Sequence, residues 1–481
     1  MNNNIDGGKM ITLKVDNQAH LYPESQLPGY VLNQIKDRLT FANPAFEKAE
    51  KQGRYTGNIP QEIRGYRLEG DNLLLPRGFT AQLVEIIRAA GLAYRVEDHR
   101  RVLPEVNITF LGDLHDFQVE AVDAMEARYF GTLAAPTGSG KTVMALALIA
   151  RRRQPALIVV HTTELLNQWV GQIEKFLGIS ARKIGKIGGS NKKRLKIGGQ
   201  ITVALVQSLC KCASEVAPHI GHLVIDECHR APSRTFTEAV TAFDSRFMLG
   251  LSATPWRRDG LSRLIYWYIG DKVHEVDKGA LEEAGHVLRA EVIWRETDFE
   301  SSFNPAEEYS QMLSELTQDP ARNGLIAQDV AREANGGGGV CLVLSDRKDH
   351  CKALVALLAG RGVKADLLTG DLSNGERQTV VAALNAGQVK VLVATGQLIG
   401  EGFDCKEFST LFLACPVKFS GRLLQYLGRV LRPAPGKEKA RVFDYVDLKI
   451  GVLKNSAEGR ARVYAGESGG SHPSPPSLPL K

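Results

Sequence analysis

Short apolar runs of strand length recur through the middle and the end of the chain, with longer segments between them. These runs lie at 156–160, 201–206, 223–225, 247–251, 340–344 and 391–394. Continuous apolar character is typical of strands that are buried on both faces. Strands that alternate with helical segments predict parallel sheets covered by helices. We therefore expect an α/β fold over most of the chain.

The first 105 residues follow a different pattern, which predicts a small separate α+β unit. Residues 10–15 alternate like a strand, and 66–75 read as two short strands around a Gly-Asp-Asn turn. Residues 27–39 and 79–90 have helical spacing. Cations that could contact nucleic acid, or simply form a solvated face, are Lys48, Lys51, Arg54, Arg64, Arg67 and Arg77.

Composition narrows the class of protein. The chain has 481 residues, too many for one core, and its 43% hydrophobic and 24% charged content is ordinary for a globular protein. A net charge of +6 permits a polyanionic partner without requiring one. The seven cysteines show no paired Cys-x-x-Cys spacing, which favours reduced thiols and a cytoplasmic location. No apolar run approaches the ~18 residues of a membrane span.

The segment 135–142, Ala-Pro-Thr-Gly-Ser-Gly-Lys-Thr, joins an apolar run to a helix-like run. A strand, a glycine-bearing loop and a helix form the context of a phosphate-binding loop, whose backbone N–H groups surround an anion. Lys141 is placed to reach the β- and γ-phosphates of ATP, and Thr142 to bind Mg²⁺. The residues expected to hold ATP through this loop are Pro136, Thr137, Gly138, Ser139, Gly140, Lys141 and Thr142.

Other polar positions near the loop suit the same chemistry. The carboxamide of Gln118 offers donors and an acceptor that match the N6/N7 edge of adenine. Asp226 can hold Mg²⁺ through water, and Glu227 can orient and polarise the attacking water. Adjacent acids are common in turns after strands, but their position downstream of the loop favours phosphoryl transfer. The run 247–251 ends in two hydroxyl residues, Ser252 and Thr254.

These motifs occur in the order used by superfamily 2 helicases, which the chain resembles. Gln118, the 135–142 loop, Asp226-Glu-Cys-His229 and Ser252-Ala-Thr254 form the first half of the set. In the second half, 340–345 resembles motif IV, 391–404 resembles motif V, and 425–432 matches the motif VI pattern Gln-x-x-Gly-Arg-x-x-Arg. The branch is similar to XPB and its bacterial and phage relatives, although Arg258 stands where XPB proteins carry a glutamate.

The resemblance implies two tandem RecA-like parallel-sheet domains, with ATP and Mg²⁺ in the cleft between them. Beside Lys141, Asp226 and Glu227, it implies that Arg429 and Arg432 are catalytic, as arginine fingers. The remaining roles it implies are nucleotide binding by Gly402 and Asp404, metal binding by Thr142 and Asp226, and coupling by Ser252, Thr254 and Gln425.

Hydroxyl and amide side chains at strand ends are expected to grip successive phosphates of one nucleic-acid strand. Such contacts position a strand and carry no sequence information. Each of these residues could equally be a helix cap or a turn residue. The candidates are Thr163, Gln207, Ser345, Thr369 and Thr395.

The domains we expect are 1–105 (α+β, with nucleic-acid or damage recognition as one role), 106–285 (ATP-binding helicase domain), 286–455 (C-terminal helicase domain) and a disordered Gly/Ser/Pro-rich tail, 456–481. The resemblance implies an ATP-dependent DNA helicase or translocase that acts on single strands or branched duplexes in repair, recombination or defence. Candidate partner proteins are a nuclease or a repair protein. An RNA helicase and a regulatory ATPase or scaffold subunit remain alternatives.

Overall fold

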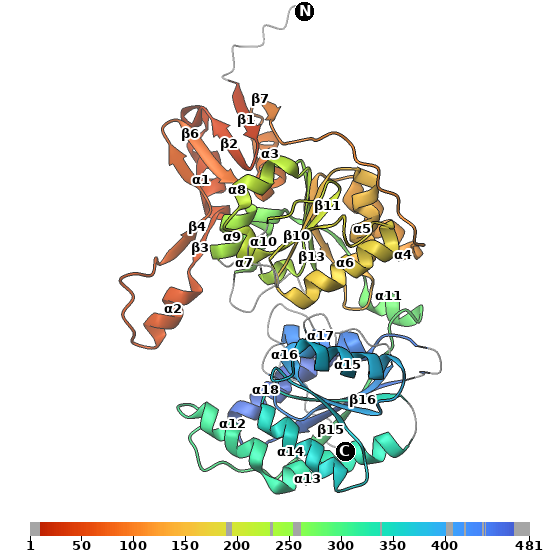
Figure 1. Cartoon of the computed structure of the whole chain (residues 1–481). Coiled ribbons are helices and arrows are strands. Elements are labelled where there is room, and N and C mark those ends of the chain that lie inside the picture. Colours follow the sequence, from red (N-terminus) through yellow and green to blue (C-terminus); the bar gives the residue numbers. More distant parts are fainter. Residues whose placement is uncertain are drawn as a thin grey trace, which may run out of the picture. The chain divides into compact units, whose positions relative to one another are not determined.

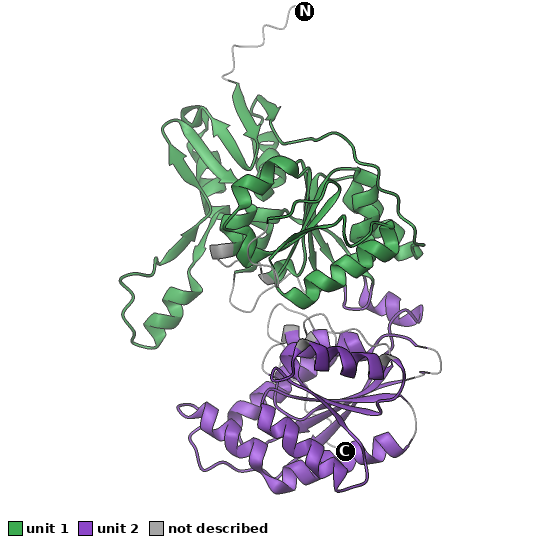
Figure 2. Cartoon of the chain, in the orientation of Figure 1, with its two compact units in different colours: residues 1–135, 140–276 green, residues 136–139, 277–481 purple. Residues whose placement is uncertain are grey.

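The structure is a computed structural model that describes residues 10–188, 195–230, 234–253, 261–336, 339–400, 407–417, 420–434, 437 and 439–465. The chain divides into two compact units (Figure 2). One comprises residues 1–135 with 140–276, and the other comprises 136–139 with 277–481. Each unit contains its own central parallel sheet, which confirms the expected α/β class.

The first unit begins with a mixed five-stranded sheet in the order β5-β6-β2-β1-β7 (Figure 1). Its strands are β1 (Ile11–Val15), β2 (Gln18–Tyr22), β5 (Arg67–Glu69), β6 (Asn72–Pro76) and β7 (Tyr94–Asp98). Helices α1 (Gly29–Arg38) and α3 (Thr80–Ala89) bury their apolar faces in the same core as the sheet. The strands expected at 10–15 and within 66–75 are confirmed as β1, β5 and β6.

Between α1 and β5 the chain leaves this sheet to form a separate two-stranded arm. The arm consists of β3 (Thr40–Ala42), α2 (Pro44–Lys51) and β4 (Glu62–Arg64), with β3 and β4 paired antiparallel. Asn43 links the two sides of the arm where β3 passes into α2, because the Asn43 Oδ1 atom accepts from the N–H of Ala45 at 3.0 Å and Nδ2 donates to the carbonyl of Pro60 at 2.8 Å.

A seven-stranded sheet forms the body of the first unit, in the order β10-β11-β9-β12-β13-β8-β14, with every pair parallel. Its strands are β8 (Phe130–Ala134), β9 (Ala156–Val160), β10 (Gly185–Ile187), β11 (Ile201–Leu205), β12 (His222–Ile225), β13 (Phe247–Ser252) and β14 (Lys272–Glu275). Every residue of β9 and β12 is buried, which explains the uninterrupted apolar sequence of β9 and of residues 223–225 in β12; the buried His222 that begins β12 lies 3.0 Å from the Arg152 guanidinium.

Helices flank this sheet as expected of an alternating α/β chain. They are α4 (Asp116–Glu126), α5 (Lys141–Arg152), α6 (Thr163–Leu177), α7 (Val206–Leu209), α8 (Ala213–Val216), α9 (Arg234–Val240) and α10 (Ser262–Ile269). The short helix η2 (Arg77–Phe79) of the N-terminal part packs directly on α10. A Cβ atom at Gly78 would lie 2.4 Å from the carbonyl oxygen of Tyr266, so only glycine allows this approach.

The second unit contains a six-stranded parallel sheet in the order β15-β20-β19-β16-β18-β17. Its strands are β15 (Ala290–Glu296), β16 (Val340–Ser345), β17 (Asp366–Leu368), β18 (Val391–Thr395), β19 (Phe408–Leu413) and β20 (Ala440–Val446). Its helices are α11 (Lys278–Glu283), α12 (Tyr309–Gln318), α13 (Pro320–Asn335), α14 (Lys348–Ala359), α15 (Asn374–Asn385), α16 (Gly396–Gly400), α17 (Ser420–Val430) and α18 (Gly451–Tyr464).

Helix α18 corrects one expectation. Disorder was expected from residue 456 onward, but the helix continues to Tyr464 and buries Leu453, Ala457 and Val463. The guanidinium of Arg460 donates to both carboxylate oxygens of Asp444 in β20, at 2.7 and 2.8 Å. The predicted start of the tail was therefore wrong, and residues 466–481 lie outside the described residues.

Replacing Arg460 by Ala is expected to destabilise the second unit. The Asp444 side chain is fully buried, so among the described residues its carboxylate would keep only the 2.8 Å bond from the Tyr464 hydroxyl. Leaving one member of a buried pair without its partner costs about 3–5 kcal/mol. Urea unfolding of Arg460→Ala beside Arg462→Ala, on the same helix, measures this effect. Equal stability of the two variants would show that the pair does not hold α18 to the sheet.

Candidate functional site

The phosphate-binding loop lies between β8 and α5, as its sequence predicts. Gly138 and Gly140 have φ values of +96° and +83°, in the left-handed region that favours glycine. The Ser139 hydroxyl donates to the carbonyl of Pro136 at 2.8 Å, which closes the turn. The Lys141 Nζ atom donates to the carbonyl of Ala135 at 2.9 Å, so its ammonium lies over the start of the loop. Thr142 follows in the first turn of α5.

Gln118 touches the end of this loop. Its side chain belongs to a capping box at the start of α4, where the N–H of His115 donates to Gln118 Oε1 at 3.1 Å. A Cβ atom at Gly140 would lie 2.4 Å from Gln118 Nε2. The carboxamide is therefore held beside the loop. The capping bond uses one lone pair of the Oε1 atom. The adenine contact predicted for Gln118 stays a prediction.

The two acids of the Asp-Glu-Cys-His run follow β12. The Asp226 carboxylate accepts from the indole N–H of Trp169 in α6 at 2.8 Å and from the N–H of Glu227 at 2.9 Å. Burial, and then the adjacent charge of Glu227, raise the pKa of Asp226 to about 6. Glu227 has a φ of +49°, a strained conformation for a residue other than glycine.

A chain of side chains connects the acids to the next strand. The Glu227 Oε2 atom lies 3.2 Å from Nδ1 of His229, and the same ring nitrogen lies 3.1 Å from the Ser252 hydroxyl. Ser252 ends β13, where its carbonyl accepts from the N–H of Ala135 at 2.9 Å. Glu227, Ser252 and the loop therefore meet at the carboxyl edge of three neighbouring strands, where open α/β sheets bind ligands.

Two of these positioning residues were not assigned from the sequence. His229 stands in the motif itself, so its place two residues after Glu227 was an available signal. Trp169 lies 57 residues before Asp226, and only the packing of α6 reveals it. Thr254, predicted to act with Ser252, lies outside the described residues.

Thr163 and Gln207 lie at the same edge of the first parallel sheet. Thr163 begins α6 directly after β9, and Gln207 lies in α7 after the neighbouring strand β11. Both side chains are exposed. The Gln207 amide makes only a long bond, 3.4 Å, to the carbonyl of His161. Both residues keep polar groups that a phosphate could contact.

In the second unit the three predicted hydroxyl residues also share one edge, but they differ in exposure. Ser345 and Thr395 end paired strands opposite each other, and Thr369 follows β17. Ser345 and Thr369 are each only 1% exposed, whereas Thr395 is half-buried. This burial argues against direct phosphate contacts by Ser345 and Thr369.

The surroundings of Ser345 explain its burial. Its hydroxyl lies 2.9 Å from Nδ1 of His350 and accepts from the N–H of Arg347 at 3.1 Å. The other ring nitrogen of His350 lies 2.8 Å from Oδ1 of Asn323, an atom that can only accept. Burial lowers the pKa of His350 to about 3, so the ring is neutral. His350 therefore donates to Asn323 and accepts from Ser345, and that hydroxyl acts within the fold.

Helix α17 carries three predicted residues, Gln425, Arg429 and, just past its end, Arg432. The Lys437 ammonium donates to the carbonyls of Val430 and Arg432, at 2.5 and 2.7 Å, and so closes the end of the helix. Near its middle, α17 approaches the start of α16 so closely that a Cβ at Gly396 would lie 2.1 Å from the Tyr426 hydroxyl. Gly402 and Asp404 lie outside the described residues.

The donor set suits Mg²⁺ held jointly with phosphates. Within the described ranges, no group of three or more His, Cys, Asp or Glu side chains is arranged to hold a metal ion by itself. Mg²⁺ typically takes one or two protein carboxylates together with substrate phosphates and water, which fits Asp226 and Thr142. In that same part of the chain, no helix combines the length and apolar character needed to cross a bilayer.

Comparisons with known proteins agree with this arrangement. Residues 111–257 match the family model described as type III restriction enzyme, res subunit, and residues 325–434 match the helicase conserved C-terminal domain. The protein named probable helicase D10 of Escherichia phage T5 is 24% identical over 454 residues, covering 94% of this chain and 93% of that one.

Two other comparisons extend the likeness. The DNA 3'-5' helicase XPB of Kineococcus radiotolerans is 26% identical over 350 residues, covering 69% of this chain and 59% of that protein. A solved fragment assigned as an HsdR subunit of a type I restriction enzyme from Vibrio vulnificus has a TM-score of 0.54 and 19% identity. That likeness covers 73% of this chain and 66% of the fragment, and it shows a shared fold.

Proposed function

Because the chain is a superfamily 2 helicase with XPB-like relatives, an ATP-hydrolysing enzyme that acts on nucleic acid, we propose that it translocates on DNA. The observation that carries the proposal is the Glu227–His229–Ser252 chain at one sheet edge. It places the predicted water-activating acid next to the strand beside the phosphate loop, so a change at the nucleotide can be transmitted through three neighbouring side chains.

In this proposal each residue at the carboxyl edge of the first parallel sheet has one role in ATP hydrolysis. Lys141 and the loop amides hold the β- and γ-phosphates, and Glu227 accepts the proton of the attacking water. Mg²⁺, held by Thr142 and Asp226, would supply charge neutralisation at the phosphates. Gln118, beside the loop, is assigned the adenine edge.

The proposed division of labour assigns ATP binding to 106–285, arginine fingers to 286–455 and nucleic-acid recognition to 1–105. Thr163, Gln207 and Thr395 remain the proposed phosphate contacts of the strand. The preference for DNA is supported by the name of the XPB relative, and a role in repair, recombination or defence is proposed on the same ground. A nuclease or a repair protein is the proposed partner.

Nucleic acid is expected to activate ATP hydrolysis. A strand that is gripped best in the closed state shifts the population toward closure, and closure brings the arginines to the phosphates. Because the grip is on phosphates, stimulation should be nearly independent of sequence and should fall steeply between roughly 50 and 200 mM salt. Turnover with single-stranded DNA, matched RNA or neither, across a salt series, tests this expectation.

Point variants and duplex substrates distinguish the alternative functions. Gln207→Ala should raise the DNA concentration needed for half-activation. Gln388→Ala is the matched control, because Gln388 is exposed and precedes β18, at the amino edge of the second parallel sheet. Displacement of matched DNA and RNA duplexes then decides between the two substrates. Equal turnover with and without any nucleic acid would favour the regulatory ATPase or scaffold alternative.

A further inference from the structure

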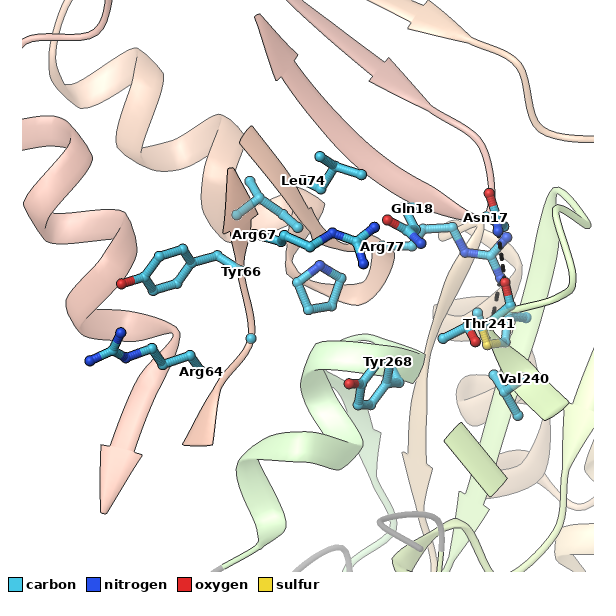
Figure 3. A pocket seen from close by; sticks show the side chains of 14 residues that line it. Asn17, Gln18, Arg64, Tyr66, Arg67, Leu74, Arg77, Val240, Thr241 and Tyr268 are labelled. Carbon is cyan, nitrogen blue, oxygen red and sulfur yellow. Dashed lines mark hydrogen bonds between the residues drawn. The ribbon is translucent and has the colours of Figure 1, made fainter. Parts of the chain in front are cut away.

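A cavity of about 320 Å³ lies inside the first unit, between the N-terminal sheet and the first parallel sheet (Figure 3). It is lined from one side by β2, β5 and β6 and from the other by α9, β13 and α10. Its fourteen lining residues, all within the described part of the chain, include three arginines and two tyrosines but no Asp or Glu. The lining therefore includes cations but no carboxylate.

Of the three arginines that line the cavity, Arg77 is the buried one. Its side chain is 3% exposed, and its Nη1 atom donates to the carbonyls of Ser245 and Phe243 at 2.9 and 3.2 Å. Within the described part of the chain, its Nε atom makes no hydrogen bond. Burial lowers the pKa of Arg77 to about 10, so the guanidinium is still a cation at neutral pH.

No carboxylate in the described structure pairs with this buried charge. The three acids whose charges act on Arg77 are Asp16, Asp98 and Asp244. Each is already engaged with a different cation, at 3.1, 2.7 and 2.9 Å respectively. A buried cation whose hydrogen-bond partners are neutral, here carbonyl oxygens and the Met248 sulfur at 3.7 Å, is costly, and an anion that enters the cavity would offset that cost.

The mouth of the cavity presents a second arginine. The Arg67 side chain is 66% exposed and is paired with Glu69 at 2.7 Å, an exposed pair of small energetic value that a ligand can displace. Figure 3 shows Arg67, Gln18 and Arg77 along one side of the cavity, with Tyr268 across from them. Burial raises the pKa of Tyr268, so its phenol stays protonated and able to donate.

We propose that this cavity binds the phosphate group of a single nucleotide, with Arg67 and Gln18 as contacts above the buried charge of Arg77. A guanidinium fork fits phosphate with two parallel hydrogen bonds, and the volume lies at the small end of ligand sites, roughly 300–1,000 Å³. Tyr268 faces the sugar or base. The phosphate comes from a free nucleotide or from a polynucleotide, and only the second source rests on the proposed function.

The test uses the full chain with its ATP site filled by a non-hydrolysable ATP analogue. Three probes are titrated by calorimetry: deoxythymidine monophosphate, a single-stranded oligonucleotide with a 5′-phosphate, and the same oligonucleotide without it. Losing a charge-assisted bond pair should weaken binding by about tenfold or more in Arg67→Ala. Gln18→Ala should weaken the same probe less, because it removes a neutral contact.

Arg95→Ala is the matched control. Arg95 lies on β7, the opposite edge of the same sheet, is 56% exposed, and pairs with Glu97 at 2.8 Å much as Arg67 pairs with Glu69. Loss of binding only in Arg67→Ala supports the cavity. The affected probe names the source: the mononucleotide, a strand end, or, when both oligonucleotides weaken alike, an internal phosphate. No difference between Arg67→Ala and Arg95→Ala with any probe overturns the proposal.

The same titrations separate this inference from the proposed function. If mononucleotide binding depends on Arg67 but nucleic acid does not change ATP turnover, the cavity proposal is supported and the translocase proposal fails. If DNA strongly activates ATP turnover equally in the parent and in Arg67→Ala, and no probe binds in an Arg67-dependent way, the translocase proposal is supported and the cavity proposal fails.

Discussion

Glu227→Gln is expected to lower ATP turnover by roughly 10²–10⁴-fold while leaving ATP bound. Glutamine keeps the shape of Glu227 and its position near His229, but it cannot take a proton from water. Removal of the Glu227 charge also removes the like-charge contribution that helps to raise the pKa of Asp226 to about 6. Asp226 should then ionise more readily, and Mg²⁺-ATP should bind the variant at least as tightly as the parent.

Lys141→Ala, in contrast, is expected to weaken ATP binding as well as turnover, because the Lys141 ammonium lies at the start of the phosphate loop. Equilibrium binding of ATP and steady-state turnover, measured on both variants with a thermal unfolding check, give the comparison. Near-normal turnover in Glu227→Gln would remove Glu227 from the catalytic role.

The parts of this molecule that its sequence predicts are those in which local chemistry dictates structure. A strand buried on both faces is mostly apolar, so β9 and residues 223–225 of β12 are visible as apolar runs. A loop that turns its N–H groups inward needs left-handed residues, so the glycines at 138 and 140 mark it. Residues at the carboxyl ends of neighbouring parallel strands meet, which brings the loop, Glu227 and Ser252 together.

The parts that could not be predicted depend on partners distant in the sequence. Helix α18 contains glycine, asparagine and serine, a composition that predicts a disordered tail. In the structure, however, Arg460 pairs with Asp444 on a buried strand. Ser345 ends a strand at the expected edge, yet His350 and Asn323 from two helices enclose its hydroxyl. Arg77 read as one of several surface cations, and packing of η2 against α10 buries it.

Arg429→Ala and Arg432→Ala are each expected to cut ATP turnover by about 10³-fold or more, with ATP affinity of the open form nearly unchanged. Both residues belong to the second unit, whereas Lys141 and Glu227 belong to the first. In the proposed mechanism these guanidinium groups meet the γ-phosphate only on closure, so they act on the transition state and contribute little to initial binding.

Arg422→Ala supplies the control on the same helix. Arg422 lies seven residues before Arg429, its side chain is 48% exposed, and it pairs with Asp346 at 3.4 Å. Turnover at saturating DNA, together with ATP binding in its absence, should separate the three variants into one nearly unchanged and two deeply impaired. A loss of only a few-fold in both Arg429→Ala and Arg432→Ala would mean that neither is a finger. Charge on the phosphates would then have to be neutralised by Lys141 and Mg²⁺ alone, and hydrolysis would no longer require closure.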